Sequence, residues 1–591
     1  MTVIEITVYD VSRVDIKALP PVTSLAQLPR ESGDDPSGVM IKSLPRSCGD
    51  LYLQRENNMS TRVPKVLTPD QAPIGESDAA EAKRFCLLYH EIISINYQGE
   101  TRLMSLPEAY AALAENQVDD FPGLRPHQKH FWHATLCQIG AIAMVNEGID
   151  DPPVEPEVWL QIIRNLTVGE FPDDEPWHLS VEDYTKPAFL QPAVSSAEKR
   201  ADYKGEIFTP DEMDLPVGSK HHDIRNNNMR NATAEQWLFA LVAKQTGGGY
   251  DGNRLFGSSR MNSGSGNRHG FSLTPSTRWG AHVSRDLQVL VNQHRGKDVN
   301  HLLLWTRPWD GGRDESLPLQ QLAPLPLYVE VSRRIRLEAD SKGSLKGRYA
   351  TSRAPRIHAK EANGMTHDPW TITETEKSVT VSNAGFDYRQ TSRYLDPTRF
   401  TLPSLARHVP TVDGDNQMHL VARAIVRGQG KTEGYHERTI PLGRGAARMF
   451  GSISEQARLH RAAQERLNII AEVQSILSHA VKTYLQDGVS DGKTKAEHQK
   501  LIAGARRRVD QAMDPGFWTD LQEELESADP QRTKAEWCHQ ILVKQARDIL
   551  NDVVRSGLCH GKEQYRATAE ANDLFGRRVS NSSKLPEIPE G

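Results

Sequence analysis

The sequence predicts an α+β protein in which a mixed α/β body is followed by a C-terminal four-helix bundle. Strand-type and helix-type patterns alternate along residues 85–443. Beyond Gly443 only helical periodicity is found, in long stretches that are joined by short connections. Connections this short favour antiparallel helices that pack side by side as a bundle.

Length and composition indicate a globular protein. The chain has 591 residues, of which 38% are apolar and 25% are charged, and its 42 glycines account for the modest apolar share. Its apolar runs are shorter than the ~18 residues that a membrane span needs. Five widely spaced cysteines without a CxxC pair predict neither a disulfide framework nor a structural zinc site. We expect a soluble, cytoplasmic protein without a metal or cofactor.

Residues 1–84 differ from the rest of the chain. They are rich in Pro, Ser and Asp and lack a sustained period, which predicts a poorly ordered N-terminal extension. The body begins at Phe85, where FCLLYHEIISINYQGETRLMSL alternates apolar and polar residues around a turn at Gly99. This pattern predicts a β-hairpin, and a short helix is expected at about residues 106–115.

Two longer helices are predicted next. In the segment 125–147, apolar residues recur at three- and four-residue spacing, and Pro126 fits the first turn of a helix. AEQWLFALVAKQ, at about residues 234–245, predicts a second helix that ends at Gly247–Gly249.

Strands are predicted in the second half of the body. HLLLWT (301–306) and PLYVEVSRRIRL (326–337) are apolar, β-branched or aromatic and are bounded by Pro and Gly. HLVARAIV (419–426) and YHERTIPL (435–442) flank GQGKTEG, which predicts a hairpin with an extended basic tip.

The C-terminal domain, residues 444–591, comprises the helical bundle and a tail. Its helical stretches are expected at roughly 453–487, 494–513, 516–527, 532–556 and 563–575.

The net charge of −6 conceals an uneven distribution. Residues 147–183 hold eleven acids and one base, Arg164. Residues 220–270 hold seven bases and three acids, and residues 331–360 hold nine bases and two acids. Basic zones of this kind are either solvated faces or surfaces for nucleic acid, and composition alone leaves both interpretations open.

KHHDIRNNNMR, residues 220–230, is a polar loop with two interpretations. Its two histidines and its aspartate are possible metal ligands of a nuclease, although three consecutive residues cannot all face one ion on a regular element. The favoured interpretation is a loop whose side chains bind phosphates and base edges. The side chains concerned are Lys220, His221, His222, Asp223, Arg225 and Asn226.

GGGYDGNRLFGSSRMNSGSGNRHG, residues 247–270, interleaves glycines with arginine, serine and asparagine. Glycines let a backbone approach a sugar–phosphate chain closely and present N–H groups to oxyanions. The segment is neither a Walker loop, because no GK[ST] follows, nor a Rossmann loop, because it does not join a strand directly to a helix. A long loop of this composition inside a globular body indicates a binding role.

Nucleophilic catalysis has no support in the sequence. The serines of residues 247–270 lie in no G-x-S-x-G elbow. His127, His130 and His133 share helical spacing but lie in an apolar helix, which predicts structural histidines with satisfied hydrogen bonds. No catalytic residue is predicted.

Seven motifs in order resemble those of a known family. They are RPHQKHFWHATLCQIGAIAM (125–144), KPAFLQP (186–192), KHHDI (220–224), WLFALVAKQT (237–246), SRMNSGSGNR (259–268), PLYVEVSRRIRL (326–337) and GMTHDPW (364–370). From about Phe85 to Arg578 the chain resembles the CasA family, the large subunit of the type I-E CRISPR surveillance complex Cascade.

The resemblance implies the same fold, an α/β body with a C-terminal four-helix bundle, and a non-catalytic role. Family members bind the 5′ handle of the CRISPR RNA (crRNA), recognise the protospacer-adjacent motif (PAM) in duplex DNA and start strand separation. They also help to recruit the helicase–nuclease. The expected partners are therefore crRNA, double-stranded target DNA, its displaced strand, the other Cascade subunits and the helicase–nuclease. A metal-dependent nuclease that uses His221, His222 and Asp223 is the alternative.

The resemblance also implies roles for two loops. Residues 220–230 correspond to the loop that docks on the RNA handle and on neighbouring subunits. The family's glycine loop, which approaches the minor groove of the PAM through its backbone, corresponds to a Gly/Ser turn here. The residues of this turn are Gly257, Ser258, Ser259 and Arg260.

Two further elements follow from the resemblance. The family's lysine finger falls at Ile357, so Arg356 or Lys360 is expected to supply the PAM-contacting cation. The wedge hairpin that inserts beneath the PAM corresponds to Gly428–Gly434. Its candidate residues are Gln429, Lys431 and Thr432.

Consecutive arginines stand out in the helical domain. Arg506, Arg507 and Arg508 spread over about 200° of a helix and cannot all face a core. They either form a solvated face or contact the target duplex or displaced strand.

Overall fold

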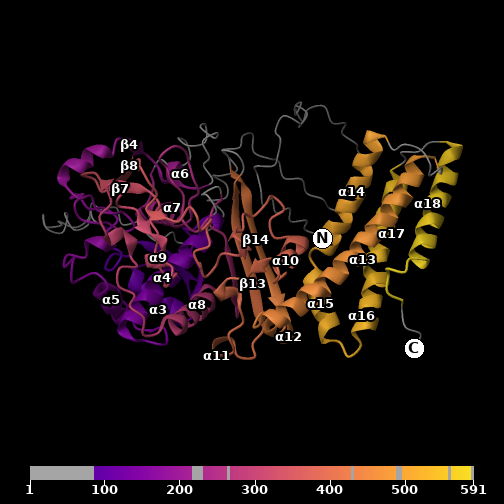
Figure 1. The fold of residues 1–591 in the computed structure, drawn as a ribbon, viewed down its shortest axis with the longest axis horizontal. Helices are drawn as coiled ribbons and strands as arrows, with labels where there is room; N and C mark the ends of the chain where they lie inside the picture. The colour runs from indigo at the N-terminus through magenta and orange to yellow at the C-terminus, as the bar shows by residue number, and fades with distance from the viewer. Residues whose placement is uncertain are drawn as a thin grey trace, which may run out of the picture. The chain divides into compact units, whose positions relative to one another are not determined.

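The computed structural model describes residues 85–215, 231–261, 266–427, 432–487, 495–556 and 561–587 (Figure 1). All of them belong to one compact unit, residues 74–591. The extension predicted for residues 1–84 lies outside the described residues. No helix within the described ranges is both long enough and apolar enough to cross a membrane.

The body opens with the predicted hairpin. Strands β1 (Ile93–Tyr97) and β2 (Glu100–Met104) pair around a two-residue turn, in which Gln98 and Gly99 have φ of 51° and 83°. Positive φ at both turn residues gives a turn whose twist matches that of the strands. Strand β3 (Val118–Asp120) completes a sheet of order β2-β1-β3, and α3 (Leu106–Ala114) is the predicted short helix.

Helix α4 (Lys129–Glu147) is the centre of the first hydrophobic core. It follows the short 3₁₀ turn η4 (Pro126–Gln128) and ends at Gly148, whose φ is 68°. All residues from His130 to Val145 are buried, because other helices pack around α4. These helices are α5 (Pro156–Asn165), α7 (Ala234–Gly247) and α8 (Trp279–His294).

Two larger three-stranded antiparallel sheets carry most of the rest of the body. One has the order β4-β8-β7 and the other β14-β13-β5. Their strands are β4 (Gly205–Ile207), β7 (Arg334–Ala339), β8 (Leu345–Ala350), β5 (Gly270–Thr274), β13 (Met418–Arg427) and β14 (Thr432–Leu442). Strands β13 and β14 form the predicted long hairpin.

The prediction of a strand at 301–306 is wrong. Its last three residues form the 3₁₀ turn η8 (Leu304–Thr306), and residues 326–333 of the other predicted strand lie outside the regular strand β7. Leu302, Leu303, Leu304 and Trp305 are all buried. A short, wholly apolar run predicts burial but does not separate a strand from a buried turn.

Short elements connect these parts. The strands are β6 (Leu317–Pro318), β9 (Ile357–His358), β10 (Thr373–Glu374), β11 (Lys377–Ser378) and β12 (Phe400–Thr401). Of these, β10, β11 and β12 form a further three-stranded antiparallel sheet. The helices are α6 (Pro210–Met213), α9 (Leu319–Leu322), α10 (Tyr388–Tyr394), α11 (Pro410–Asp413) and α12 (Arg444–Arg448). The 3₁₀ turns are η5 (Glu175–Trp177), η6 (Ala197–Asp202) and η9 (Ser404–Ala406).

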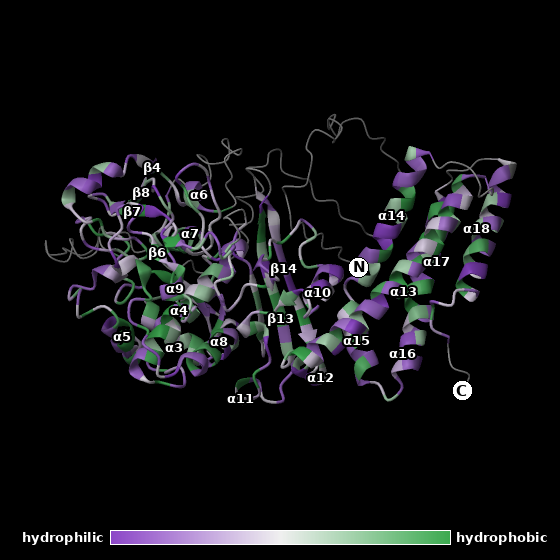
Figure 2. Ribbon diagram, in the orientation of Figure 1, coloured by the Kyte–Doolittle hydropathy of each residue, from purple (hydrophilic) through white to green (hydrophobic). Residues whose placement is uncertain are grey.

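The C-terminal region is helical, as predicted. Its helices are α13 (Ile453–Leu485), α14 (Ala496–Met513), α15 (Phe517–Glu526), α16 (Pro530–Glu536), the π-helical segment η10 (Trp537–Val543), α17 (Lys544–Arg555) and α18 (Lys562–Ser580). Segments α16, η10 and α17 run continuously, so four long helices pack together with α13 against the other three. These helices carry both hydrophilic and hydrophobic residues, as amphipathic bundle helices do (Figure 2).

A second hydrophobic core runs across the boundary predicted at residue 443. It contains Phe271 and Leu273 of β5, residues of β13 and β14, and the inner faces of the C-terminal helices. Polar contacts reinforce the junction: the Gln522 amide donates to the Pro441 carbonyl at 2.9 Å and accepts from the Gly443 N–H at 2.6 Å. The sheet and the bundle are therefore packed as one body.

Candidate nucleic-acid interface

The glycine loop, defined here as residues 248–260, is held down by a buried glutamate. Glu330 accepts hydrogen bonds from Ser258 Oγ at 2.7 Å and from the Ser259 N–H at 2.6 Å. The Ser258 N–H donates to the Gly248 carbonyl at 2.8 Å, which closes the loop on itself. The Ser258 side chain is buried, so the loop presents backbone rather than this hydroxyl at its surface.

At Gly257 two stretches of the loop backbone pack closely against each other. A Cβ at Gly257 would lie 2.7 Å from the backbone atoms of Gly249 and Tyr250, a distance that real Cβ atoms do not adopt. The obstructing atoms are backbone, which cannot rotate away. Glycine is therefore required here by packing.

Arg260, the last residue of the loop, points inward. Its guanidinium donates to Asp368 at 2.9 Å and to the Tyr328 carbonyl at 2.6 Å, and it lies 4.1 Å from the centre of the Tyr328 ring. Arg268 lies 2.7 Å from the same carboxylate. Burial opposes the ionisation of Asp368, but the two guanidiniums outweigh it and lower its pKa to about 2. Burial raises the pKa of Glu330, a shift that Arg260 opposes.

Asp251 joins the glycine loop to three other segments. Its carboxylate contacts Lys244 of α7 at 2.5 Å, Arg333 at 3.2 Å and Arg427 of β13 at 2.9 Å. Arg333 also donates to the Gly249 carbonyl at 2.6 Å. Burial opposes its ionisation, but the three cations together hold the pKa of Asp251 well below its usual value.

The tip end of strands β13 and β14 therefore lies beside the glycine loop. Arg427 is the last residue of β13, and Thr432 is the first residue of β14. Thr432 Oγ1 donates to the Leu215 carbonyl at 3.0 Å, and Leu215 is the last described residue before the predicted RNA-binding loop. Gln429 and Lys431 lie outside the described residues, as do all six candidates of residues 220–230 and the nuclease alternative that rests on three of them.

The position of Arg356 disfavours the expectation that this residue supplies the PAM-contacting cation. Its side chain is buried and donates to the carbonyls of Arg307 at 3.1 Å, Pro308 at 3.2 Å and Leu304 at 3.4 Å. Burial, helped by the charge of Arg307, lowers the pKa of Arg356 to about 10. A guanidinium that binds these carbonyls is a structural group, whereas Lys360 is exposed.

Charge counts along the sequence overestimate the basic surface. Six arginines of the two basic zones are buried in ion pairs or carbonyl contacts. They are Arg260, Arg268, Arg333, Arg334, Arg336 and Arg356. The exposed bases that remain in these zones, within the described ranges, include Arg254, Lys342, Lys346, Arg353 and Lys360.

All three arginines of α14 are exposed, as predicted for residues that cannot all face a core. Arg508 forms an ion pair with Asp552 of α17. The neighbours Ala505 and Val509 are buried and place α14 on the bundle core. Whether the arginines contact nucleic acid stays a prediction.

Each of the three histidines of the first long helical segment makes the expected hydrogen bond through Nε2, but the buried Nδ1 atoms of His130 and His133 have no partner among the described residues. His127 Nε2 lies 2.8 Å from Asp214 Oδ2, and His130 Nε2 lies 2.8 Å from the Arg268 carbonyl. His133 Nε2 lies 2.9 Å from Asp286 Oδ2. Burial lowers the pKa of His130 well below its usual value, so its neutral form is favoured.

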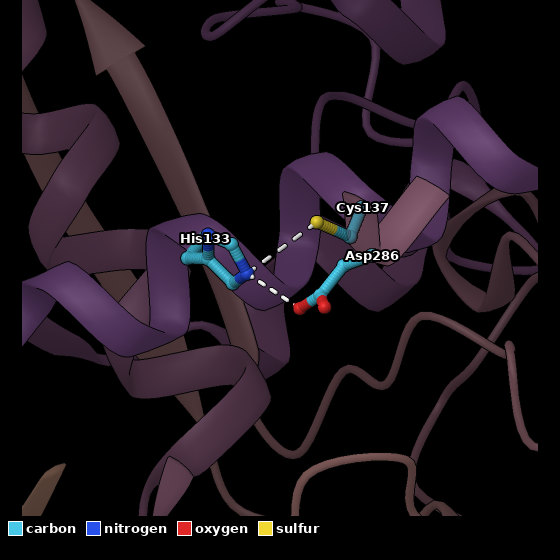
Figure 3. A group of neighbouring side chains, drawn as sticks. All are labelled: His133, Cys137 and Asp286. Atoms are coloured by element: carbon cyan, nitrogen blue, oxygen red, sulfur yellow. Dashed lines mark hydrogen bonds and ion pairs between the residues drawn. The ribbon is translucent and has the colours of Figure 1, made fainter. Parts of the chain in front are cut away.

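His133, Cys137 and Asp286 form a buried group with the composition of a metal site (Figure 3). Asp286, however, already accepts from Trp370 Nε1 at 3.2 Å and from Arg285 at 3.2 Å. Burial raises the pKa of the Cys137 thiol well above its usual value, whereas metal binding needs a thiolate. The group therefore fits a hydrogen-bonded cluster that joins α4, α8 and the segment before Trp370 better than it fits a metal site.

Sequence reasoning missed the acids that organise this interface. Asp251 and Glu330 are isolated acids that each precede an arginine by three residues, whereas Asp368 has no arginine nearby in the sequence. An acid in an otherwise apolar run, such as Glu330 in PLYVEV, is the available signal, because a buried carboxylate needs a partner. The identity of that partner depends on the tertiary fold.

The fold and sequence were compared with those of known proteins. CasA (Cse1) from Thermus thermophilus has 16% sequence identity, covers 85% of this chain and 100% of its own, and superposes with a TM-score of 0.57. Cse1 from Acidimicrobium ferrooxidans gives 13% identity, 84% and 98% coverage and a TM-score of 0.58. Cse1 from Thermobifida fusca gives 14% identity, 87% and 100% coverage and a TM-score of 0.57.

These similarities establish a shared fold. A comparison with curated proteins gives no match. The family model of the CRISPR-associated protein Cse1 matches residues 176–549, more than half of the chain, including the glycine loop, Asp368 and the β13–β14 hairpin. The chain therefore belongs to the Cse1 (CasA) family, the family of the large subunit of the type I-E CRISPR complex Cascade.

Proposed function

We propose that this chain recognises the PAM in double-stranded target DNA within a crRNA-guided Cascade complex and helps to start strand separation. The observation that carries the proposal is the convergence at Asp251. This carboxylate joins the glycine loop to the tip end of strand β13, two elements that PAM reading and strand opening require side by side.

The glycine loop supports backbone reading of the minor groove. Gly257 keeps the loop slim, and Glu330 turns the Ser258 hydroxyl away from the surface. Base pairs present a degenerate pattern in the minor groove, so a backbone reader tolerates several PAM sequences. Lys360, being exposed, is the proposed cation beside the loop in place of Arg356.

The β13–β14 hairpin is the proposed wedge. Its tip, which includes Gln429 and Lys431, follows strands that are paired along their whole length. Opening one base step costs about a few kcal/mol, which PAM contacts must offset before RNA pairing takes over.

Further roles are proposed for the remaining segments. Residues 220–230 contact the crRNA 5′ handle and neighbouring subunits, and the exposed arginines of α14 contact the duplex or displaced strand. The assembled subunit recruits the helicase–nuclease, and the chain itself is not an enzyme. The purified chain with Mg²⁺ or Mn²⁺ should therefore leave labelled DNA intact, whereas cleavage that His221→Ala removes would favour the nuclease alternative.

Strand-opening kinetics on the reconstituted ribonucleoprotein test the division of roles. Replacing Gln429, Lys431 and Thr432 with glycine should leave the initial PAM affinity intact but slow opening. Lys360→Ala should weaken the initial affinity instead. A target with a pre-melted bubble beside the PAM should rescue the hairpin variant alone. Equal rescue of both variants, or of neither, would contradict the proposal.

A further inference from the structure

A groove of about 620 Å³ lies far along the sequence from the proposed DNA-binding loops. It is lined by strand β2, helix α3 and the start of α5, and α3 packs against α5 (Figure 1). Its apolar lining comprises Tyr97, Leu103, Met104, Ala111, Ala112 and Val154.

Strand β2 gives this groove an unpaired edge. It is the outer strand of the sheet β2-β1-β3, and Glu100–Leu103 are exposed. Leu103 is 55% exposed and Val154 is 47% exposed, and both line the groove. The sequence of β2, ETRLM, has no proline to remove a backbone donor from the edge, and its two charged residues, Glu100 and Arg102, pair with each other. Within the described part of the chain, the outer edge of β2 is therefore open to a further strand.

The groove is also acidic. Its lining includes Glu91, Glu108 and Glu115 but one base, Arg102. Arg102 is already engaged, since it donates to Glu100 at 3.1 Å and lies 5.3 Å from the centre of the Tyr97 ring.

The surroundings of the groove add further negative charge. The acidic segment 147–183 contains α5, and its Glu155 and Glu157 flank the start of that helix and are exposed. A negative field of this kind repels the phosphates of nucleic acid and attracts basic partners.

We propose that this groove binds an extended, basic segment of a partner protein, which adds as a strand to the free edge of β2. Backbone hydrogen bonds from β2 would supply affinity, and alternate side chains of the bound segment would supply specificity. Its apolar side chains would cover Leu103 and Val154, while its lysines or arginines would face Glu91 and Glu115. A helical partner is disfavoured, because it would leave the backbone groups of the β2 edge without partners.

A peptide probe tests this on the full-length chain. A labelled ten-residue peptide that alternates valine and lysine should bind, as measured by fluorescence anisotropy, and one that alternates valine and glutamate should not. Bound peptide should slow amide hydrogen exchange in Glu100–Met104. The lysine peptide with methylated nitrogens at every second residue should lose binding, because it cannot complete the strand pairing.

Charge reversal supplies the protein-side test. The double variant Glu91→Lys/Glu115→Lys should weaken binding of the lysine peptide about tenfold or more. The matched control Glu563→Lys/Glu570→Lys makes the same change in net charge on exposed positions of α18 and should leave binding unchanged.

Several outcomes would overturn the proposal. They are no binding of the lysine peptide, equal binding of the glutamate peptide, equally weakened binding in both double variants, or exchange protection away from β2. Equal protection of β2 by a single-stranded DNA probe would identify the groove as a nucleic-acid site instead.

Discussion

Arg427 donates a hydrogen bond to Asp251 at 2.9 Å across 176 residues of sequence. Arg427 lies at the tip end of strand β13 and Asp251 lies in the glycine loop, and Lys244 and Arg333 share the same carboxylate. The relative placement of the two elements is thus fixed by one acid surrounded by three cations.

Asp251→Asn should loosen this junction. It keeps the size of the side chain but leaves three cations without a countercharge, so the free energy of unfolding should fall by about 1–3 kcal/mol. Amide hydrogen exchange should quicken in the glycine loop and at the end of β13. Denaturant unfolding and exchange mass spectrometry measure both effects, with Glu570→Gln on α18 as the control. An unchanged exchange pattern would show that the carboxylate does not fix the loop.

Lowering the pH from about 4 to 2 should weaken the contacts of Asp368 with Arg260 and Arg268. The folded-state pKa of Asp368 is lowered to about 2, whereas an unfolded aspartate has a pKa of about 3.9. The stabilisation is therefore complete above about pH 4 and is lost as pH falls toward 2. Asp368→Asn should lower stability at neutral pH by about 3–5 kcal/mol and flatten its pH dependence below pH 4. Urea midpoints from pH 2 to pH 6 measure the slope, and identical slopes below pH 4 in the two proteins would contradict this assignment.

Replacing two glycines with alanine should change stability in opposite directions, because packing decides the effect at one position and helix propensity at the other. Gly257→Ala places a methyl against the backbone of Gly249 and Tyr250 and should destabilise the protein by about 1–3 kcal/mol. Gly504→Ala lies in α14 with open space around it and should stabilise by about 0.5–1 kcal/mol. Thermal unfolding measures both. An unchanged stability of Gly257→Ala would mean that the loop backbone can shift to accommodate the methyl group.

Replacing Arg356 should affect protein stability, whereas replacing Lys360 should affect DNA binding. Arg356→Ala removes the donors of a buried set of carbonyls and should lower the free energy of unfolding by about 1.5–3 kcal/mol. Lys360→Ala should leave stability within about 0.5 kcal/mol of the original while weakening binding of PAM-containing duplex by the assembled complex. Denaturation and duplex binding are measured on both variants. A stable Arg356→Ala with weakened DNA binding, together with a destabilised Lys360→Ala, would contradict the assignment.

The arginines of α14 are expected to act through phosphates. In the assembled complex, replacing Arg506, Arg507 and Arg508 with alanine should reduce the salt dependence of DNA affinity by about 0.7–0.9 in log–log slope for each phosphate that is no longer neutralised. Helicity by circular dichroism should stay unchanged, because these side chains are exposed. A salt series with an unchanged slope would identify them as a solvated face.

Helices and strands could be predicted from the sequence better than the contacts between residues far apart in the chain. The hairpin at β1 and β2, the helix α4 and the long hairpin of β13 and β14 were predictable, because each follows from a local period and a turn residue. The burial of Arg356 was not, since it depends on carbonyls some 50 residues away. Likewise, the alignment of Glu330 with Ser258 arises only when α7 and the segment after α9 pack together.

The core that runs across residue 443 has a mechanical consequence. Arg438 of β14 binds Asp514 in the bundle at 2.5 Å, and Gln522 of α15 binds the backbone at both Pro441 and Gly443. Strand β14 thus continues at one end into the hairpin tip and is anchored to the C-terminal helices at the other. We therefore expect a displacement of those helices to act directly on one end of β14, while the Arg427–Asp251 and Thr432–Leu215 contacts at the other end resist it.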